Sequence, residues 1–151
     1  MGDTVALVVA AGRGNRFGGE LPKQYARLGG WPVLRYSLEA YRRHPGIAAV
    51  QAVIHPDDQD HYEQAAAGLD LPPPAAGGAS RQESVRRGLE HIAGADPARV
   101  LIHDAARPFV DAGTIDRVLR ALDAAPGAIA ALPVTDTLKR GGDGRIAGTV
   151  P

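Results

Sequence analysis

Apolar runs and amphipathic helical patterns alternate along this chain of 151 residues, and that alternation restricts its fold more than any other feature. Continuous apolar runs predict strands at residues 4–9, 48–54, 99–102 and 128–134. Apolar side chains at helical spacing, with capping residues and glycine or proline stops, predict helices that begin near residues 32, 57, 80 and 115. Residues 71–79, rich in proline and glycine, are predicted as a loop. Strands that alternate with helices indicate an α/β sandwich, with a mainly parallel sheet and helices on both faces.

The first predicted strand leads directly into a glycine-rich, cationic loop, AAGRGNRFGG at residues 10–19. Small residues let a ligand approach backbone N–H groups, and Arg13, Arg16 and Lys23 supply positive charge. Phosphates need both, so the loop predicts a site for a nucleoside triphosphate. It matches neither common nucleotide motif, because Phe17 replaces the third glycine of the dinucleotide fingerprint and no P-loop ending follows. The alternative is a turn that needs flexible glycines and binds nothing.

Three loops of the predicted sheet should meet at one rim, since ligands in parallel α/β folds bind beyond the carboxyl ends of the strands. These loops are residues 10–23, 77–84 and 103–108. Ser80 and Glu83 form a capping box in the second loop, so the amino end of the following helix also faces the rim. A helix amino end favours phosphate, which agrees with the triphosphate prediction.

The last part of the chain has a different pattern. Residues 133–140 are extended and polar, residues 141–144 form a turn, and residues 145–150 run back, which predicts a β-hairpin with few apolar side chains of its own. Such a hairpin needs something to pack against, and we expect an arm that embraces a second subunit; a surface hairpin without a partner is the alternative. The chain is thus divided into a core, residues 1–132, and an arm, residues 133–151.

Composition excludes several classes of protein. With 17 basic and 17 acidic residues the net charge is zero, which argues against a nucleic-acid binder or a protein of anionic membranes. No apolar run approaches the ~18 residues of a membrane helix, and the first residues are not those of a secretory signal. The absence of cysteine excludes disulfides and thiolate metal sites and fits the reducing cytoplasm. We therefore expect a cytoplasmic protein that binds small anionic molecules.

Five blocks of sequence occur in an order that is typical of one enzyme family. They are Ala10-Ala11-Gly12-x-Gly14-x-Arg16, Pro22-Lys23-Gln24-Tyr25, Gly77-Gly78-x-x-Arg81-x-x-Ser84-Val85, His103-Asp104-Ala105-Ala106-Arg107-Pro108 and Asp136-Thr137-x-Lys139-Arg140. Together they resemble the 2-C-methyl-D-erythritol 4-phosphate cytidylyltransferases of the non-mevalonate isoprenoid pathway. The resemblance covers nearly the whole chain. It implies a Rossmann-like nucleotidyltransferase fold, CTP and Mg²⁺ as ligands, and a homodimer joined by β-arms.

The reaction that the resemblance implies is attack by a substrate phosphate oxygen on the α-phosphorus of CTP, which expels pyrophosphate. Catalysis of this kind is mainly positioning and charge stabilisation around an in-line transition state. The resemblance assigns Arg16 and Lys23 to the stabilisation of the pentacoordinate phosphorus. Mg²⁺ would be held mainly by the CTP phosphates, and no metal-binding residue is assigned. The alternative for Lys23 is a solvated surface lysine.

CTP contacts are implied for backbone groups at several small residues and for one hydroxyl. The nucleotide-binding set is Ala10, Ala11, Gly12, Arg13, Gly14, Gly77, Gly78, Ser84 and Ala105. Fixed amides and carbonyls can distinguish the amino group and two acceptors of cytosine from the groups of uracil. Ser84 has the alternative of a polar residue in a first helical turn. Arg81 in the same turn is unfavourable without a nearby anion, which favours an anionic ligand.

A polyol phosphate is implied as the second substrate, with contacts to Asp104, Arg107 and Thr137. Thr137 would reach the substrate site of the neighbouring subunit. The alternatives are an ion pair of Asp104 with Arg107, and a solvated charged strand around Thr137. His103 is expected to be structural, because an attacking phosphate does not need to lose a proton to a base.

Members of this family are usually longer, and an arginine, a lysine and a final strand and helix of theirs would follow Pro151. We therefore expect a complete CTP half and an incomplete methylerythritol half, in a fragment or in the first part of a bifunctional enzyme that also carries the next cyclase. Two other functions stay open. One is a cytidylyltransferase for another polyol phosphate, such as ribitol 5-phosphate, and the other is a non-catalytic nucleotide-binding or dimerisation module.

Overall fold

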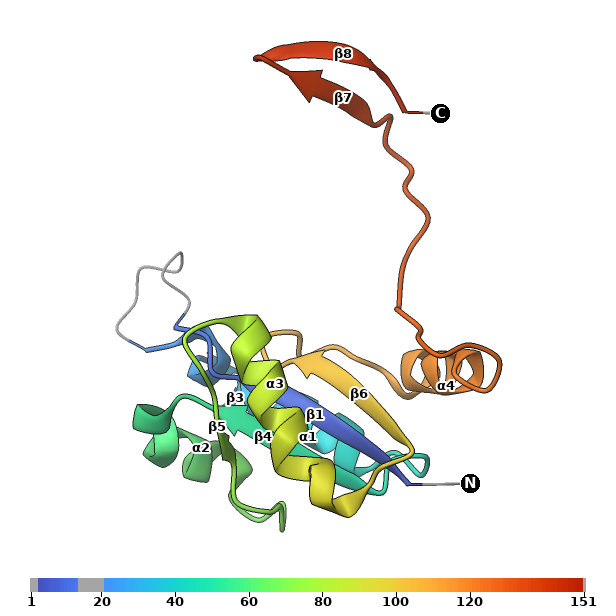
Figure 1. Ribbon diagram of the computed structural model, residues 1–151. Coiled ribbons are helices and arrows are strands. Elements are labelled where there is room, and N and C mark those ends of the chain that lie inside the picture. The colour runs from blue at the N-terminus through green and yellow to red at the C-terminus, as the bar shows by residue number, and fades with distance from the viewer. Residues whose placement is uncertain (1–2, 14–20, 151) are drawn as a thin grey trace.

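A four-stranded parallel sheet forms the centre of the computed structural model, which describes residues 3–13 and 21–150 (Figure 1). The strands are β1 (Thr4–Ala10), β4 (Ala49–Ile54), β5 (Ala75–Ala76) and β6 (Arg99–Asp104), in the order β5-β4-β1-β6. Every neighbouring pair is parallel. The chain thus adds β4 and β5 on one side of β1 and β6 on the other, which is the arrangement that opens a crevice at the carboxyl ends of the strands.

Helices connect these strands. They are α1 (Val33–Arg42), α2 (Gln59–Ala66), α3 (Arg81–Ile92) and α4 (Ala112–Ala121), with short 3-10 turns η1 (Lys23–Tyr25), η2 (Pro56–Asp58) and η3 (Ala93–Ala95). The strands β2 (Arg27–Leu28) and β3 (Trp31–Pro32) form a small antiparallel pair before α1. None of the helices in the described part of the chain is long and apolar enough to span a membrane.

Alternate side chains of β1 face opposite layers of helices. Ala6 and Val8 are fully buried in one apolar cluster with Leu34 and Leu38 of α1, to which α2 and α4 also contribute. Leu7 faces the other way, toward α3, which crosses the front of the sheet in Figure 1. Gly88 brings α3 close, because a Cβ atom there would lie 2.8 Å from Leu7 Cδ1. The predicted α/β sandwich with helices on both faces is confirmed.

A separate antiparallel hairpin follows the sheet. It consists of β7 (Lys139–Gly142) and β8 (Arg145–Thr149), and all of its residues are exposed except the half-buried Gly148. Figure 1 shows it at the end of an extended segment that leaves α4, away from the sheet. The predicted hairpin therefore exists and has the form of an arm.

Two sequence predictions about strands are wrong. Residues 128–134 form no strand, and Ile129 and Leu132 in this segment are 88% and 89% exposed. The apolar pattern reports a tendency to be buried, but a strand also needs an adjacent edge, and among the described residues this segment has no paired partner. Conversely, Ala75 and Ala76 lie in the predicted loop but pair with Val53 and Ile54 of β4. Two small residues carry no periodicity from which that pairing could be read.

Candidate nucleotide-binding site

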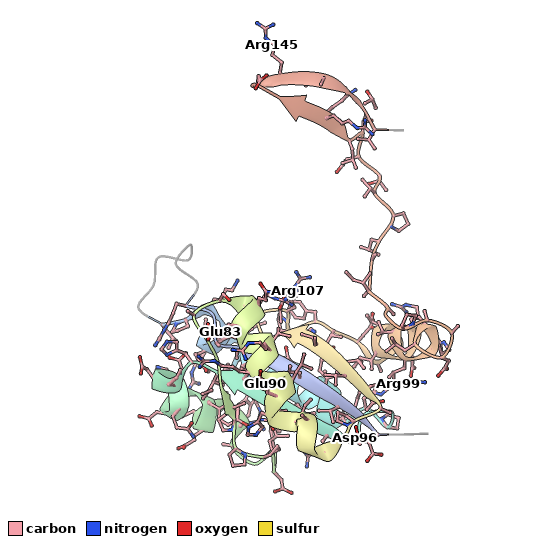
Figure 2. The ribbon with its side chains drawn as sticks, in the orientation of Figure 1. Glu83, Glu90, Asp96, Arg99, Arg107 and Arg145 are labelled. Atoms are coloured by element: carbon pink, nitrogen blue, oxygen red, sulfur yellow. The ribbon has the colours of Figure 1, made fainter. Side chains whose placement is uncertain are left out.

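The turns that follow the four parallel strands surround one cavity of about 1240 Å³. Its lining includes residues 9–13 after β1, 55–56 after β4, 77–81 after β5 and 104–107 after β6. Figure 2 shows Glu83 and Arg107 at this end of the sheet, with Asp96 and Arg99 at the opposite end. The three loops predicted to share a rim do share it, and the turn after β4 joins them.

Gln24 fixes the backbone of the first loop. Its side chain is buried, and Nε2 donates hydrogen bonds to the carbonyl oxygens of Ala10 at 2.7 Å and Gly12 at 2.9 Å. Each proton of the amide group thus holds one carbonyl. The sequence places Gln24 in the motif Pro22-Lys23-Gln24-Tyr25 but predicts no role for it, and its position beside Lys23 is the one signal that could have drawn attention to it. Residues 10–12 therefore meet the cavity with a set backbone conformation.

The segment after β5 lies directly against this loop. Gly77 donates its N–H to Ile54 O at 2.7 Å, and a Cβ atom at Gly77 would lie 2.3 Å from Ala11 Cβ. Ser84 in α3 accepts a hydrogen bond from Gly78 N–H at 3.0 Å and donates one to Ser80 O at 2.8 Å. The small residues that follow β1 and β5 thus lie in contact with each other, and their backbone groups line the cavity.

The Ser80 half of the predicted capping box at the start of α3 is present, while the Glu83 side chain bonds to the N–H one residue before the cap. Ser80 Oγ accepts from Glu83 N–H at 3.1 Å, while Glu83 Oε2 accepts from Ala79 N–H at 2.9 Å. The bond from Ala79, with a further one from Arg87, lowers the pKa of Glu83 below its usual value. Glu83 is therefore occupied in shaping the turn after β5.

Asp104 lies between two arginines at the end of β6. Its carboxylate accepts from Arg81 Nε at 2.9 Å and pairs with Arg107 Nε at 3.4 Å. The Arg107 carbonyl is hydrogen-bonded to His103 Nε2 at 3.0 Å, and burial lowers the pKa of His103 below its usual value. The ion pair weighed as an alternative for Asp104 is present, and it leaves Arg81 and Arg107 beside the cavity.

Positive charge predominates around the described part of the cavity. The basic side chains that line it are Arg13, Lys23, Arg81, Arg87 and Arg107, whereas Asp104 is the one acidic residue among the described lining. A concave site with this balance attracts a polyanion such as a triphosphate. Arg13 is bound to His55, Asp57 and Asp58, so its charge is already partly matched.

Mg²⁺, which the family resemblance implies, needs few protein ligands here. The described residues contain no group of three or more histidine and carboxylate side chains that could hold a metal ion. Mg²⁺ at nucleotide sites commonly uses one or two carboxylates together with phosphate oxygens and water. Asp104 could supply one carboxylate oxygen, so the residues present fit a metal that arrives with the nucleotide.

Most of the predicted site residues are brought together. Those that line the cavity are Ala10, Ala11, Gly12, Arg13, Lys23, Gly77, Gly78, Ser84, Asp104, Ala105 and Arg107. Gly14 and Arg16 lie outside the described residues. Thr137 lies on the segment that leads to β7 and does not line the cavity of its own chain. Arg87 and His55 line the cavity but were not predicted, and neither lies in a recognisable position of a motif.

Comparison with known proteins identifies the family. Residues 4–151 match the family model described as IspD: 2-C-methyl-D-erythritol 4-phosphate cytidylyltransferase. This chain belongs to that family. The bifunctional enzyme IspD/IspF of Paramagnetospirillum magneticum is 61% identical over 99% of the chain and 39% of its own length. The 2-C-methyl-D-erythritol 4-phosphate cytidylyltransferase of Cereibacter sphaeroides is 51% identical over 97% of the chain and 65% of its own length.

The fold agrees with solved structures of IspD proteins. The 4-diphosphocytidyl-2C-methyl-D-erythritol synthase of Anaerococcus prevotii superimposes with a TM-score of 0.84 at 27% identity, over 99% of this chain and 65% of that chain. The chain therefore spans between about two fifths and two thirds of these IspD relatives. What it shares with them over its whole length is the nucleotidyltransferase fold with its arm.

Proposed function

We propose that this chain forms the cytidylyltransferase part of an enzyme that joins CTP and 2-C-methyl-D-erythritol 4-phosphate. The products are 4-diphosphocytidyl-2-C-methyl-D-erythritol and pyrophosphate. One observation carries the proposal: four of the five sequence blocks that resemble the family contribute to a single cationic cavity at the carboxyl ends of the parallel strands. The family membership gives the cavity its reaction.

The cytosine ring would bind between the first loop and the turn after β5. Ala10, Ala11, Gly77 and Gly78 offer backbone groups there, and Gln24 holds the Ala10 carbonyl in place. Fixed donors and acceptors discriminate between bases because a mismatched base leaves them unpaired. Ser84 already bonds to Gly78 and Ser80, so its first contribution would be to orient Gly78.

The phosphates would lie toward Lys23 and Arg16. Both the attacking phosphate and the α-phosphate are anionic, so cations beside them stabilise the charge that accumulates in the transition state. Arg107 would hold the methylerythritol phosphate, and Asp104 would offer a carboxylate oxygen to Mg²⁺. Mg²⁺ would neutralise phosphate charge when bound.

The arm would join two subunits, and Thr137 would reach the substrate site of the partner. Support comes from the exposure of β7 and β8, which pair with each other and leave both faces of the hairpin in solvent. A two-stranded hairpin of this kind is marginal without further packing. A location in the cytoplasm remains a prediction of the sequence.

The proposal is tested by substitution of Lys23. We expect Lys23→Gln to lower kcat for pyrophosphate release about 100-fold or more, because a lost charge at the transferred phosphorus acts in the transition state. The dissociation constant of CTP, measured by calorimetry, should rise less than about tenfold. Arg120→Gln is the control, since it removes a cation from the exposed surface of α4 and should leave both values unchanged.

The same assay separates the other two functions. If pyrophosphate is released with ribitol 5-phosphate and not with methylerythritol phosphate, ribitol 5-phosphate is the second substrate and the proposed one is rejected. CTP binding with no pyrophosphate release from either would contradict the enzyme and favour a nucleotide-binding module.

A further inference from the structure

We propose that Arg13 is a positioning residue that clamps the nucleotide-binding loop to the turn after β4. In this role the guanidinium does not neutralise the CTP phosphates, a task that would be left to Arg16 and Lys23. The inference rests on the proposed function in one respect, that the loop binds CTP. The turn after β4, residues 55–58, is called the acceptor turn below.

Among the described residues, the guanidinium of Arg13 forms hydrogen bonds with three side chains, all of them in the acceptor turn. Nη1 donates to Asp58 Oδ1 at 2.9 Å, and Nη2 donates to Asp57 Oδ2 at 2.9 Å and to His55 Nδ1 at 2.6 Å. Arg13 and Asp58 are 45 residues apart in the chain, so this contact exists only in the folded protein. Planar arginine forks suit such paired acceptors and fix orientation as well as distance.

Burial of Asp58 explains why Arg13 should stay in this position. The Asp58 side chain is only 3% exposed, and its second oxygen, Oδ2, has no hydrogen-bond partner among the described residues. The charge is felt nearby, since burial and then the Asp58 carboxylate raise the pKa of Tyr25. A buried carboxylate that loses its cation is strongly unfavourable. Transfer of Arg13 to a phosphate would leave Asp58 in that condition.

His55 completes an acceptor set that matches Arg13. Its Nδ1 atom accepts from Asp57 N–H at 3.2 Å and lies 2.6 Å from Arg13 Nη2. The 3-10 turn η2 is thereby capped by the same atom that binds the arginine. The acceptor turn thus presents three side-chain acceptors to a single donor group.

The clamp adds to the contacts that Gln24 makes with the same loop. Gln24 holds the carbonyls of Ala10 and Gly12, and Arg13 ties the next residue to the acceptor turn. The chain is therefore held at residues 10, 12 and 13, the described part of the loop that would meet the nucleotide. Pre-formed backbone donors bind better, because less conformational entropy is lost when the ligand arrives.

A double-mutant cycle tests the clamp. CTP affinity is measured by calorimetry for the unaltered chain, Arg13→Ala, Asp58→Asn and the double variant. We expect each single substitution to weaken CTP binding by about tenfold and the double variant to be no weaker than either, because both break one interaction. If Arg13 instead bound the phosphates, Asp58→Asn would leave affinity unchanged or improve it, and the clamp would be overturned.

Two further variants guard against misfolding and charge effects. Asp57 is the exposed partner of Arg13, so Asp57→Asn should leave the core intact. It should weaken CTP binding, as Arg13→Ala does. Asp60→Asn removes an acidic group from the exposed surface of α2 and should have no effect. Equal effects of Asp57→Asn and Asp60→Asn would contradict the clamp.

Amide hydrogen exchange without ligand separates the clamp from the proposed function. Arg13→Ala should speed exchange of the amides of residues 11–13 about tenfold or more, whereas Asp60→Asn should not. Unchanged exchange in Arg13→Ala would overturn the clamp even if CTP binds. Faster exchange in a chain that does not bind CTP would uphold the clamp and reject the proposed function.

Discussion

At Gly77 the absence of a side chain decides how closely two nucleotide-binding segments approach. A Cβ atom there would lie 2.3 Å from Ala11 Cβ, 3.0 Å from Ser84 Oγ and 3.1 Å from Ile54 O. Ile54 O is a backbone atom of β4, and Ala11 directly follows β1, so neither can move without moving the chain at the end of a strand. The sequence predicted Gly77 as a backbone contact for the nucleotide. It could not show that Gly77 lies against Ala11, because these residues follow β5 and β1, and β4 lies between those strands in the sheet.

Gly77→Ala should therefore disturb the site more than the fold. The added methyl group must push the turn after β5 away from Ala11, with a strain of about 1–3 kcal/mol. We expect CTP affinity, measured by calorimetry, to fall about tenfold or more. Gly94→Ala is the matched control, because a Cβ atom at Gly94 meets nothing within 4 Å. Equal CTP affinities for the two variants would contradict this account.

The helices α3 and α4 show how much of an element is decided locally. Each helix is capped by the residue before it, whose side chain accepts a hydrogen bond from the N–H three positions later. Ser80 caps α3, and Asp111 caps α4 through a bond of 2.6 Å from Thr114 N–H to Asp111 Oδ1. The start of α3 was predicted from its capping box and is confirmed. The strand at residues 128–134 was predicted from an equally plain apolar run and is wrong, because a strand depends on a partner that local sequence does not name.

These helix starts predict a dependence of stability on pH. Hydrogen bonds from Thr114 lower the pKa of Asp111, and the bond from Ala79 N–H does the same for Glu83. A carboxylate with a lowered pKa in the folded state stabilises the fold above its unfolded pKa. That contribution is lost as the pH falls through the folded pKa. The free energy of unfolding should thus decrease on acidification.

Urea unfolding between about pH 7 and about pH 3 measures this dependence. The double variant Asp111→Asn with Glu83→Gln should show a shallower decrease than the unaltered chain. Asp96→Asn is the control, because Asp96 is exposed and its left-handed backbone also suits asparagine. A curve for the double variant that runs parallel to that of the unaltered chain would refute the assignment.

The whole molecule divides into a sheet with its helices and an arm that extends from it. Figure 1 shows the hairpin of β7 and β8 beyond the extended segment after α4. The cavity is lined by residues up to Arg107, all of them before α4. The division into a core, residues 1–132, and an arm, residues 133–151, stays a prediction of the sequence.

Removal of residues 135–151 should change assembly and leave the nucleotide site intact. We expect sedimentation to report a dimer for the unaltered chain, as proposed above, and a monomer for the shortened one, while CTP affinity should change less than about twofold. The physical reason is that the arm contributes no lining residue to the cavity of its own chain. A large loss of CTP affinity would show that the arm acts on the nucleotide site, and an unchanged mass would contradict its role in assembly.

The sequence by itself determined the alternation of helices and strands, the capped start of α3 and the rim where the motifs meet. Each depends on neighbours within a few residues or on the fixed direction of parallel strands. Only the tertiary structure decided that Arg13 meets Asp58, that Gly77 touches Ala11 and that Ala75 extends the sheet. These contacts join residues distant in the chain, and packing selects among many partners that the local pattern leaves equivalent.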